Sequence, residues 1–155
     1  MVEFALALPI LIILLVALFD LGFGFYQALQ VEGAAAAGAQ YASLHQWNRE
    51  NIKNAVRTAT NVGTQVTPDV AQVCGCTDNA NNFTQLPDPP TDGSATVLGD
   101  CSSHTCPDCT TVTGAVCPAG VYASVSAELP YTPVLPYPGL PNPVMLGSQA
   151  YRRLK

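Results

Sequence analysis

The residues best suited to chemistry in this chain are six cysteines, all of which lie in one part of the sequence. They fall within residues 74–117, among many Pro, Gly, Asn and Asp residues: Cys74, Cys76, Cys101, Cys106, Cys109 and Cys117. An even number of cysteines in such a loop-rich stretch predicts a disulfide framework, formed in an oxidising compartment. The sequence does not choose among the possible pairings.

A metal site is the alternative use of these thiols. His104, Cys106 and Cys109 form the pattern H-x-C-x-x-C, which together with one more cysteine has ligands that zinc prefers. The hydrophobic N-terminus of the chain indicates export, and export favours disulfides. We therefore expect disulfides, and neither a metal nor another cofactor.

Catalytic motifs are missing from the sequence. No Ser-His-Asp arrangement, phosphate-binding loop, dinucleotide-binding turn or His-Glu-x-x-His motif occurs, and the carboxylates are dispersed. His45 is interpreted as a residue on a helix surface. We predict that the protein is not an enzyme.

The charge distribution argues against a nucleic-acid partner. Charged residues make up 11% of the chain and the net charge is −5. No Lys or Arg occurs between Thr58 and Tyr151, whereas nucleic-acid binding selects basic patches. An acidic middle of this kind suits an exported, water-facing region.

The N-terminal segment is long and apolar enough to cross a membrane. Residues 4–19 carry no charge, Asp20 interrupts, and residues 21–28 are again uncharged. About 20 helical residues cross a hydrocarbon core of ~30 Å. A signal peptide is less suitable, because no basic residues precede the run and the run exceeds the usual core of ~7–15 residues. Phe23, Phe25, Tyr26 and the later Trp47 fit an aromatic belt at the membrane surface, and the first three also fit ordinary packing.

The same helix is expected to continue from about residue 2 to about residue 45. Its second half has apolar residues at helical spacing, and small residues would let another backbone approach closely. This predicts a packing face, for a sheet or a neighbouring subunit, at Gly33, Ala35, Ala36 and Ala39. Pro9 should kink the helix or loosen one turn, because it donates no N–H.

The rest of the chain predicts a small antiparallel sheet. A second helix is expected at about 49–62, capped by Asn48, and a strand at about 69–76. Residues 77–118 are predicted to form a long loop that disulfides must staple. Two further strands, at about 121–128 and 144–153, flank a proline-rich loop, so they should pair antiparallel and cover their apolar face with the Ala-rich helix.

Several of these stretches together resemble a known family. "VEFALALPILIILL", then "DLG", an Ala/Gly-rich helix ending in "GAQYAS", and the C-terminal "YTPVLPYPGLP" with its closing strand are similar to TadE-like minor pilins, pseudopilins of the tight-adherence (Flp-type) pilus system. The resemblance covers about residues 2–43 and 121–153, and leaves the cysteine-rich middle unmatched.

The resemblance implies a fold and a function. The fold is α+β and pilin-like, with residues 1–28 as the transmembrane half of the helix and residues 29–155 as an exported head. The function is that of a minor pilin in pilus assembly, anchored in the bacterial inner membrane or incorporated into the extracellular pilus, with other pilin subunits and the inner-membrane assembly platform as partners. A prepilin peptidase would cut after a glycine upstream of the helix, and the matching assembly and processing residues are Glu3, Phe4 and Pro9.

One alternative function stays open at this point. The chain could be a single-pass anchored binding module whose disulfide-stapled loop recognises a ligand outside the cell.

Overall fold

The computed structural model describes most of the chain, and gives the backbone alone at a few positions. The described residues are 2–77, 83–86, 101, 105–110, 116–135, 139 and 141–154, with side chains left out at 2–6, 105, 107–110 and 116–118. The elements are α1 (Val2–Leu44), α2 (Arg49–Thr58), β1 (Thr67–Thr77), β2 (Phe83–Gln85), β3 (Thr105–Thr110), β4 (Val116–Pro118), β5 (Gly120–Tyr131) and β6 (Val144–Arg153).

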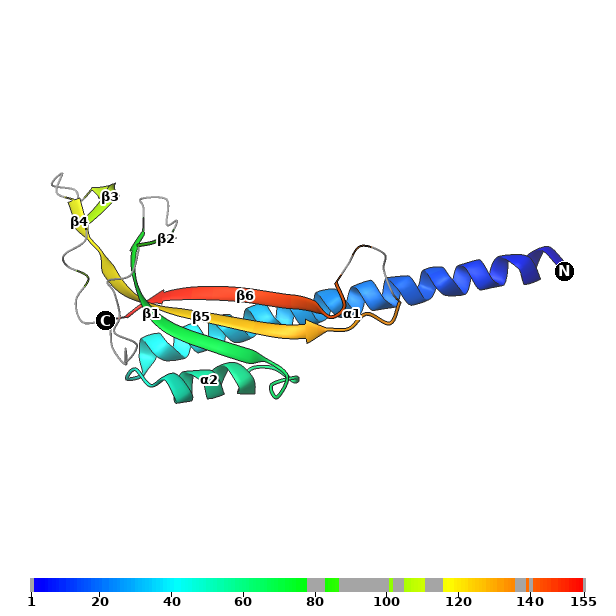
Figure 1. The fold of residues 1–155 in the computed structure, drawn as a ribbon, viewed down its shortest axis with the longest axis horizontal. Coiled ribbons are helices and arrows are strands. Elements are labelled where there is room, and N and C mark those ends of the chain that lie inside the picture. Colours follow the sequence, from blue (N-terminus) through cyan, green and yellow to red (C-terminus); the bar gives the residue numbers. More distant parts are fainter. Residues whose placement is uncertain are drawn as a thin grey trace.

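The long N-terminal helix dominates the shape of the molecule. It has 43 residues, which at 1.5 Å per residue is roughly 65 Å. Its second half lies along the sheet, whereas its first half projects from the head without covering any other element (Figure 1). The predicted single helix is confirmed, and it runs on through Pro9.

The head is built on an antiparallel sheet of four strands in the order β2-β1-β5-β6. The ladder between β5 and β6 runs from the pair Tyr122–Arg153 to the pair Tyr131–Val144, which confirms the predicted antiparallel pairing across the proline-rich connection. β5 is longer than predicted, at Gly120–Tyr131, because its ladder with β6 continues past Glu128.

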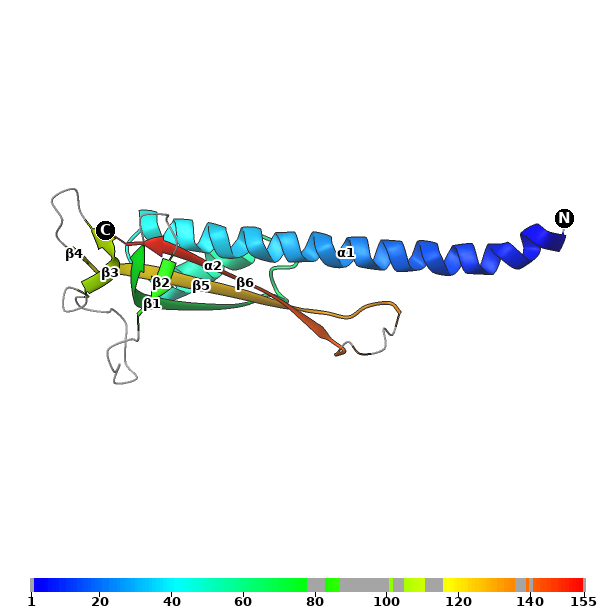
Figure 2. The ribbon, with the colours of Figure 1, turned by 90° about the horizontal axis from the view of Figure 1, so that it is seen from above.

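The two faces of the sheet have different partners. On one face Ala123, Val125, Ala127 and Leu129 of β5 are buried in the core against α1, as period-two alternation requires. On the other face the Phe83 ring packs on the rings of Tyr151 and Tyr122, with centroids 4.2 and 4.9 Å away. Figure 2 shows α1 lying across one side of the sheet.

α2 closes the core from the side. The Asn48 side chain accepts a hydrogen bond from the Asn51 amide at 3.1 Å, so the predicted cap is confirmed. Ile52 and Val56 are buried against α1 and the sheet. The helix ends at Thr58, earlier than predicted, and Ala59 caps it. The chain then turns back so closely that a Cβ at Gly63 would collide with the Arg57 carbonyl oxygen.

The region predicted as one long loop contains three short strands. β2 pairs with the end of β1, and β3 pairs with β4 in a separate two-stranded sheet. The sequence expectation of a loop over residues 77–118 is therefore corrected in the described part of that region. β2 and β4 have three residues each, too few to show a periodic pattern, and the six residues of β3, TCPDCT, include a proline and no alternation of apolar and polar residues.

Candidate functional site

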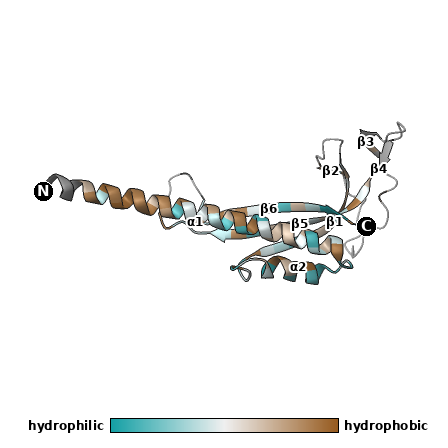
Figure 3. Cartoon of the chain, turned by 180° about the vertical axis from the view of Figure 1, so that it is seen from behind, coloured by the Kyte–Doolittle hydropathy of each residue, from teal (hydrophilic) through white to brown (hydrophobic). Residues whose placement is uncertain are grey.

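The first half of α1 is an apolar rod, and from residue 7 to residue 19 no part of the chain that the structure describes buries it. From Leu8 to Leu21 nearly every large hydrophobic side chain is exposed, and Phe19 is 76% exposed. In Figure 3 the hydrophobic colour is concentrated on this half of the helix. Among the described residues, α1 is the one helix long and apolar enough to cross a membrane. Such a surface requires either lipid or other protein chains around it.

Glu3, Phe4 and Pro9 all lie in the projecting half of α1. Glu3 and Phe4 belong to the first turn of the helix, where the structure describes the backbone alone. Pro9 lies inside the helix and has no N–H, so the carbonyl four residues before it receives no bond from it.

The head meets the rod at Asp20. This side chain is only 5% exposed, although its neighbours along the helix are mostly exposed. The Tyr131 hydroxyl, at the end of β5, donates to the Asp20 carboxylate and lies 2.9 Å from the Asp20 carbonyl oxygen. The amides of Val134 and Leu135 donate to the two carboxylate oxygens at 3.2 and 3.4 Å. We call this arrangement the Asp20 clasp.

An apolar groove adjoins the clasp. Its volume is about 240 Å³, and it lies between α1, the start of the proline-rich connection and the start of β6. The lining residues are Asp20, Leu21, Gly24, Phe25, Ala28, Tyr131, Pro133, Val144 and Leu146. Asp20 is the one charged residue in this lining, and its carboxylate already accepts the hydrogen bonds of the clasp.

Sequence reasoning missed the clasp. It treated Asp20 as an interruption of an apolar run and as part of a family resemblance, and it treated "YTPVLPYPGLP" as a loop between two strands and as part of the same resemblance. Two features of the sequence could have indicated the clasp. Asp20 is an acid within an apolar helix, and Tyr131 begins an uncharged connection that has to return along that helix.

The aromatic residues next to the clasp are on the surface. Phe23, Phe25 and Tyr26 are all more than half exposed, which favours the membrane-belt interpretation over packing in the core. Trp47 lies at the other end of α1 and packs partly against the core.

Two of the four residues predicted for a packing face of α1 pack against the head of the same chain. Ala35 and Ala39 are buried, but Gly33 and Ala36 are exposed. The residues that face the sheet and α2 are Val31, Ala34, Ala35, Gly38, Ala39 and Ala42. They follow helical spacing from Val31, and Gly33 and Ala36 fall outside that arc.

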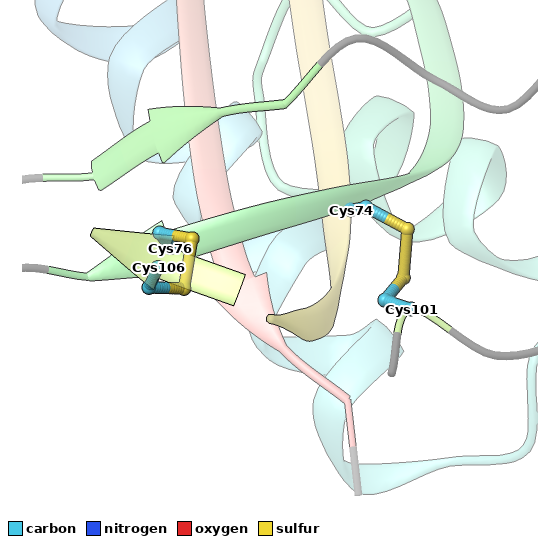
Figure 4. The surroundings of a disulfide bond; sticks show 4 residues. All are labelled: Cys74, Cys76, Cys101 and Cys106. Carbon is cyan, nitrogen blue, oxygen red and sulfur yellow. A yellow bond between two sulfur atoms is a disulfide. The ribbon is translucent and has the colours of Figure 1, made fainter. Parts of the chain in front are cut away.

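The cysteines are at the end of the head furthest from the rod. Disulfides join Cys74 to Cys101 and Cys76 to Cys106, so each tethers β1 to the segment that follows β2 (Figure 4). Cys109 and Cys117 belong to β3 and β4, where the structure describes the backbone alone.

The alternative zinc site conflicts with this pairing. Cys106 is bonded to Cys76, so its sulfur is not a thiolate that could bind a metal. His104 lies outside the described residues. In the part of the chain that the structure describes, no three His, Cys, Asp or Glu side chains gather as metal ligands would. His45 stacks on Tyr41 at the exposed end of α1, with ring centroids 4.1 Å apart.

Comparison with known protein families gives a match at the N-terminus. Residues 1–40 match the family model described as TadE-like protein. The match covers the apolar rod, the Asp20 position and most of the packing face, and it confirms the N-terminal part of the resemblance predicted from the sequence. No curated protein and no solved structure matches the chain.

Proposed function

We propose that this protein is a minor pilin that takes part in the assembly of a tight-adherence (Flp-type) pilus. The proposal starts from the match of residues 1–40 to the TadE-like family model. The family associates the chain with other pilus components and with a membrane. Within that association, the chain would act as a structural subunit which joins the pilus or its assembly platform through α1.

The exposed rod carries this proposal. A helix that packs against its own head in one half and leaves the other half apolar and uncovered needs a second environment for that half. A membrane provides one before assembly, and the helices of neighbouring subunits provide another after it. The family match falls on this same segment.

The disulfides support an exported head. Bridges such as Cys74–Cys101 form and persist in oxidising compartments, outside the cytoplasm. We therefore place residues 1–28 in the inner membrane as an anchor and residues 29–155 outside the cytoplasm as a head.

Glu3 gives the rod a means of controlling assembly. A carboxylate at a helix N-terminus is stabilised by about 0.3–1 kcal/mol when it is exposed. A charged side chain in the middle of a membrane costs roughly 2.5–3.5 kcal/mol on insertion scales. A terminal ammonium of the same or a neighbouring subunit would offset that cost, so helix registers that leave Glu3 unpaired would be disfavoured. In this proposal a prepilin peptidase generates that terminus, and Phe4 and Pro9 complete the segment it recognises.

The test is to replace Glu3 in the native host. Glu3→Gln and Glu3→Ala should strongly reduce the number of pili seen by electron microscopy, while the protein still reaches the membrane and forms its disulfides. Glu32→Gln, which changes an exposed acid further along the same helix, is the matched control and should leave piliation normal. Normal piliation in the Glu3 variants, or after deletion of the whole chain, would overturn the proposal.

A second candidate is favoured by the position of the disulfides. They hold β1 and the segment around β3 at the end of the head opposite the N-terminus, where a membrane-anchored module would present a binding surface (Figure 1). Under this alternative, deletion of the chain would leave pilus number unchanged and reduce attachment to a surface.

A further inference from the structure

We propose that the last residue of β5 and the four residues after it, 131–135, lie in the membrane beside α1, within the leaflet on the side of the head. Lipid then covers the surface that this segment forms with residues 19–26 of α1. The inference rests on membrane anchoring by α1, and it does not depend on a role in pilus assembly.

The depth of Asp20 supports this placement. A hydrocarbon core of ~30 Å takes up about 20 helical residues, so a span that begins near Phe4 reaches about to Phe23. Asp20 lies before that point, and residues 131–135 are bound to it directly. A segment that is hydrogen-bonded to Asp20 has to lie at the same depth as Asp20.

The hydrogen bonds of the clasp allow both Asp20 and residues 131–135 to lie at this depth in the membrane. Backbone away from regular structure is tolerated at membrane depth only where its polar groups are satisfied within the protein. The Val134 and Leu135 amides donate to Asp20, and the Tyr131 hydroxyl donates to it as well. Residues 131–135 thus donate hydrogen bonds to the Asp20 carboxylate, which would otherwise face lipid. In return, the carboxylate accepts hydrogen bonds from the Val134 and Leu135 amides, which would otherwise lack an acceptor there.

The surface around the clasp has the chemistry of a lipid contact. Between Glu128 and Arg152 the sequence contains no charged residue. Val134 is 76% exposed, and it lies at the same level as the exposed Phe19 and Phe23 on α1. The apolar groove opens at this level too. This uncharged surface is continuous with the projecting rod, and lipid around the rod would therefore reach it.

The experiment places a single tryptophan at Val134 in the full-length protein, reconstituted in phospholipid vesicles. The background is Trp47→Phe, so that Val134→Trp is the only indole. We expect its emission to shift to the blue, to be lost when the lipids are brominated near the carbonyl end of their acyl chains, and to resist quenching by aqueous acrylamide. The matched control is Leu44→Trp, an equally exposed apolar position at the far end of α1, which should be quenched by acrylamide and not by brominated lipid.

A second tryptophan variant separates this inference from membrane anchoring itself. Leu11→Trp, in the middle of the rod, should be quenched by brominated lipid wherever α1 spans the membrane. If Leu11→Trp is quenched and Val134→Trp is not, the anchor stands and the inference is overturned. Protection of Val134→Trp from both quenchers would mean that protein covers it, and would also overturn the inference. If neither position is quenched by lipid, membrane anchoring and the inference fail together.

Discussion

The Tyr131 hydroxyl donates to the Asp20 carboxylate across 111 residues of sequence, and so fixes the end of β5 to α1 at the point where the helix leaves the head. The amides of Val134 and Leu135 donate to the same carboxylate. The Asp20 side chain therefore accepts hydrogen bonds from three donors within residues 131–135. This contact adds to the packing of the second half of α1 on the sheet and on α2.

Removing the acid should release the returning segment. In Asp20→Ala the Val134 and Leu135 amides lose their acceptor, so both should exchange with solvent deuterium faster than in the wild type. Hydrogen bonds to charged groups contribute about 1.5–3 kcal/mol each, which sets the expected scale of the change. Hydrogen exchange of the full-length protein in detergent micelles measures it.

Two further variants identify which atoms matter. Asp20→Asn has a single accepting oxygen in place of two, so it should protect only one of the two amides. Tyr131→Phe removes one donor and keeps the ring, so its effect should be smaller than that of Asp20→Ala. The matched control is Tyr26→Phe, at an exposed tyrosine near the clasp. Unchanged exchange at Val134 and Leu135 in Asp20→Ala would contradict the clasp.

Adding one methyl group at Gly38 should destabilise the head. A Cβ at this position would collide with the buried Val56 side chain and would lie 3.0 Å from Cγ1 of Val125. Overpacking of this kind costs about 1–3 kcal/mol, which exceeds the gain of roughly 0.5–1 kcal/mol that alanine brings to a helix. Urea unfolding of the full-length Gly38→Ala protein in micelles should therefore show a net loss of stability.

Gly33→Ala is the matched control, because it makes the same change on the same helix where nothing lies within 4 Å. It should raise stability by roughly 0.5–1 kcal/mol. Equal effects of the two substitutions would contradict the packing face that runs from Val31 to Ala42.

The contrast between these two glycines shows how far the sequence could go. Helical spacing and the run of small residues predicted that α1 packs closely, and the period-two pattern predicted β5. Neither pattern sets the rotation of the helix about its axis, because Gly33 and Gly38 are chemically the same and only the positions of Val56 and Val125 distinguish them. The sequence contained both partners of the clasp but could not pair them, for a related reason, since Asp20 and Tyr131 meet only once the sheet has formed.

Each described disulfide should contribute to the stability of the head. Cys74–Cys101 and Cys76–Cys106 close loops with sequence separations of 27 and 30 residues. On the chain-entropy account, a loop of this size stabilises the folded state by about 3–4 kcal/mol. The double variant Cys74→Ser with Cys101→Ser should lower the free energy of unfolding by about this amount, measured by urea unfolding.

Peptide mapping without reduction tests the connectivity. It should recover the two described bridges, and it should recover Cys109 joined to Cys117, because six cysteines in an oxidised head leave these two as the remaining pair. Thiols that remain open to alkylation in the unreduced protein would contradict this third bridge.

Loss of an apolar side chain should destabilise the head where that side chain packs against the second half of α1, and should leave the head's stability unchanged where it lies on the rod. Ile52 of α2 is fully buried against the helix's second half, so Ile52→Ala should destabilise the head by about 2–5 kcal/mol. Leu14 lies on the exposed rod, and Leu14→Ala should leave the stability of the head unchanged, because no contact in the head is lost. Trp47, which packs partly against the core, provides a fluorescence signal for unfolding in both variants.

The rod variant Leu14→Ala should instead weaken retention of the protein in membranes, measured by alkaline extraction of vesicles. Several such substitutions together should release the protein. If Leu14→Ala destabilised the head as strongly as Ile52→Ala, the rod would be part of the folded core, and its assignment to lipid and to neighbouring subunits would fail.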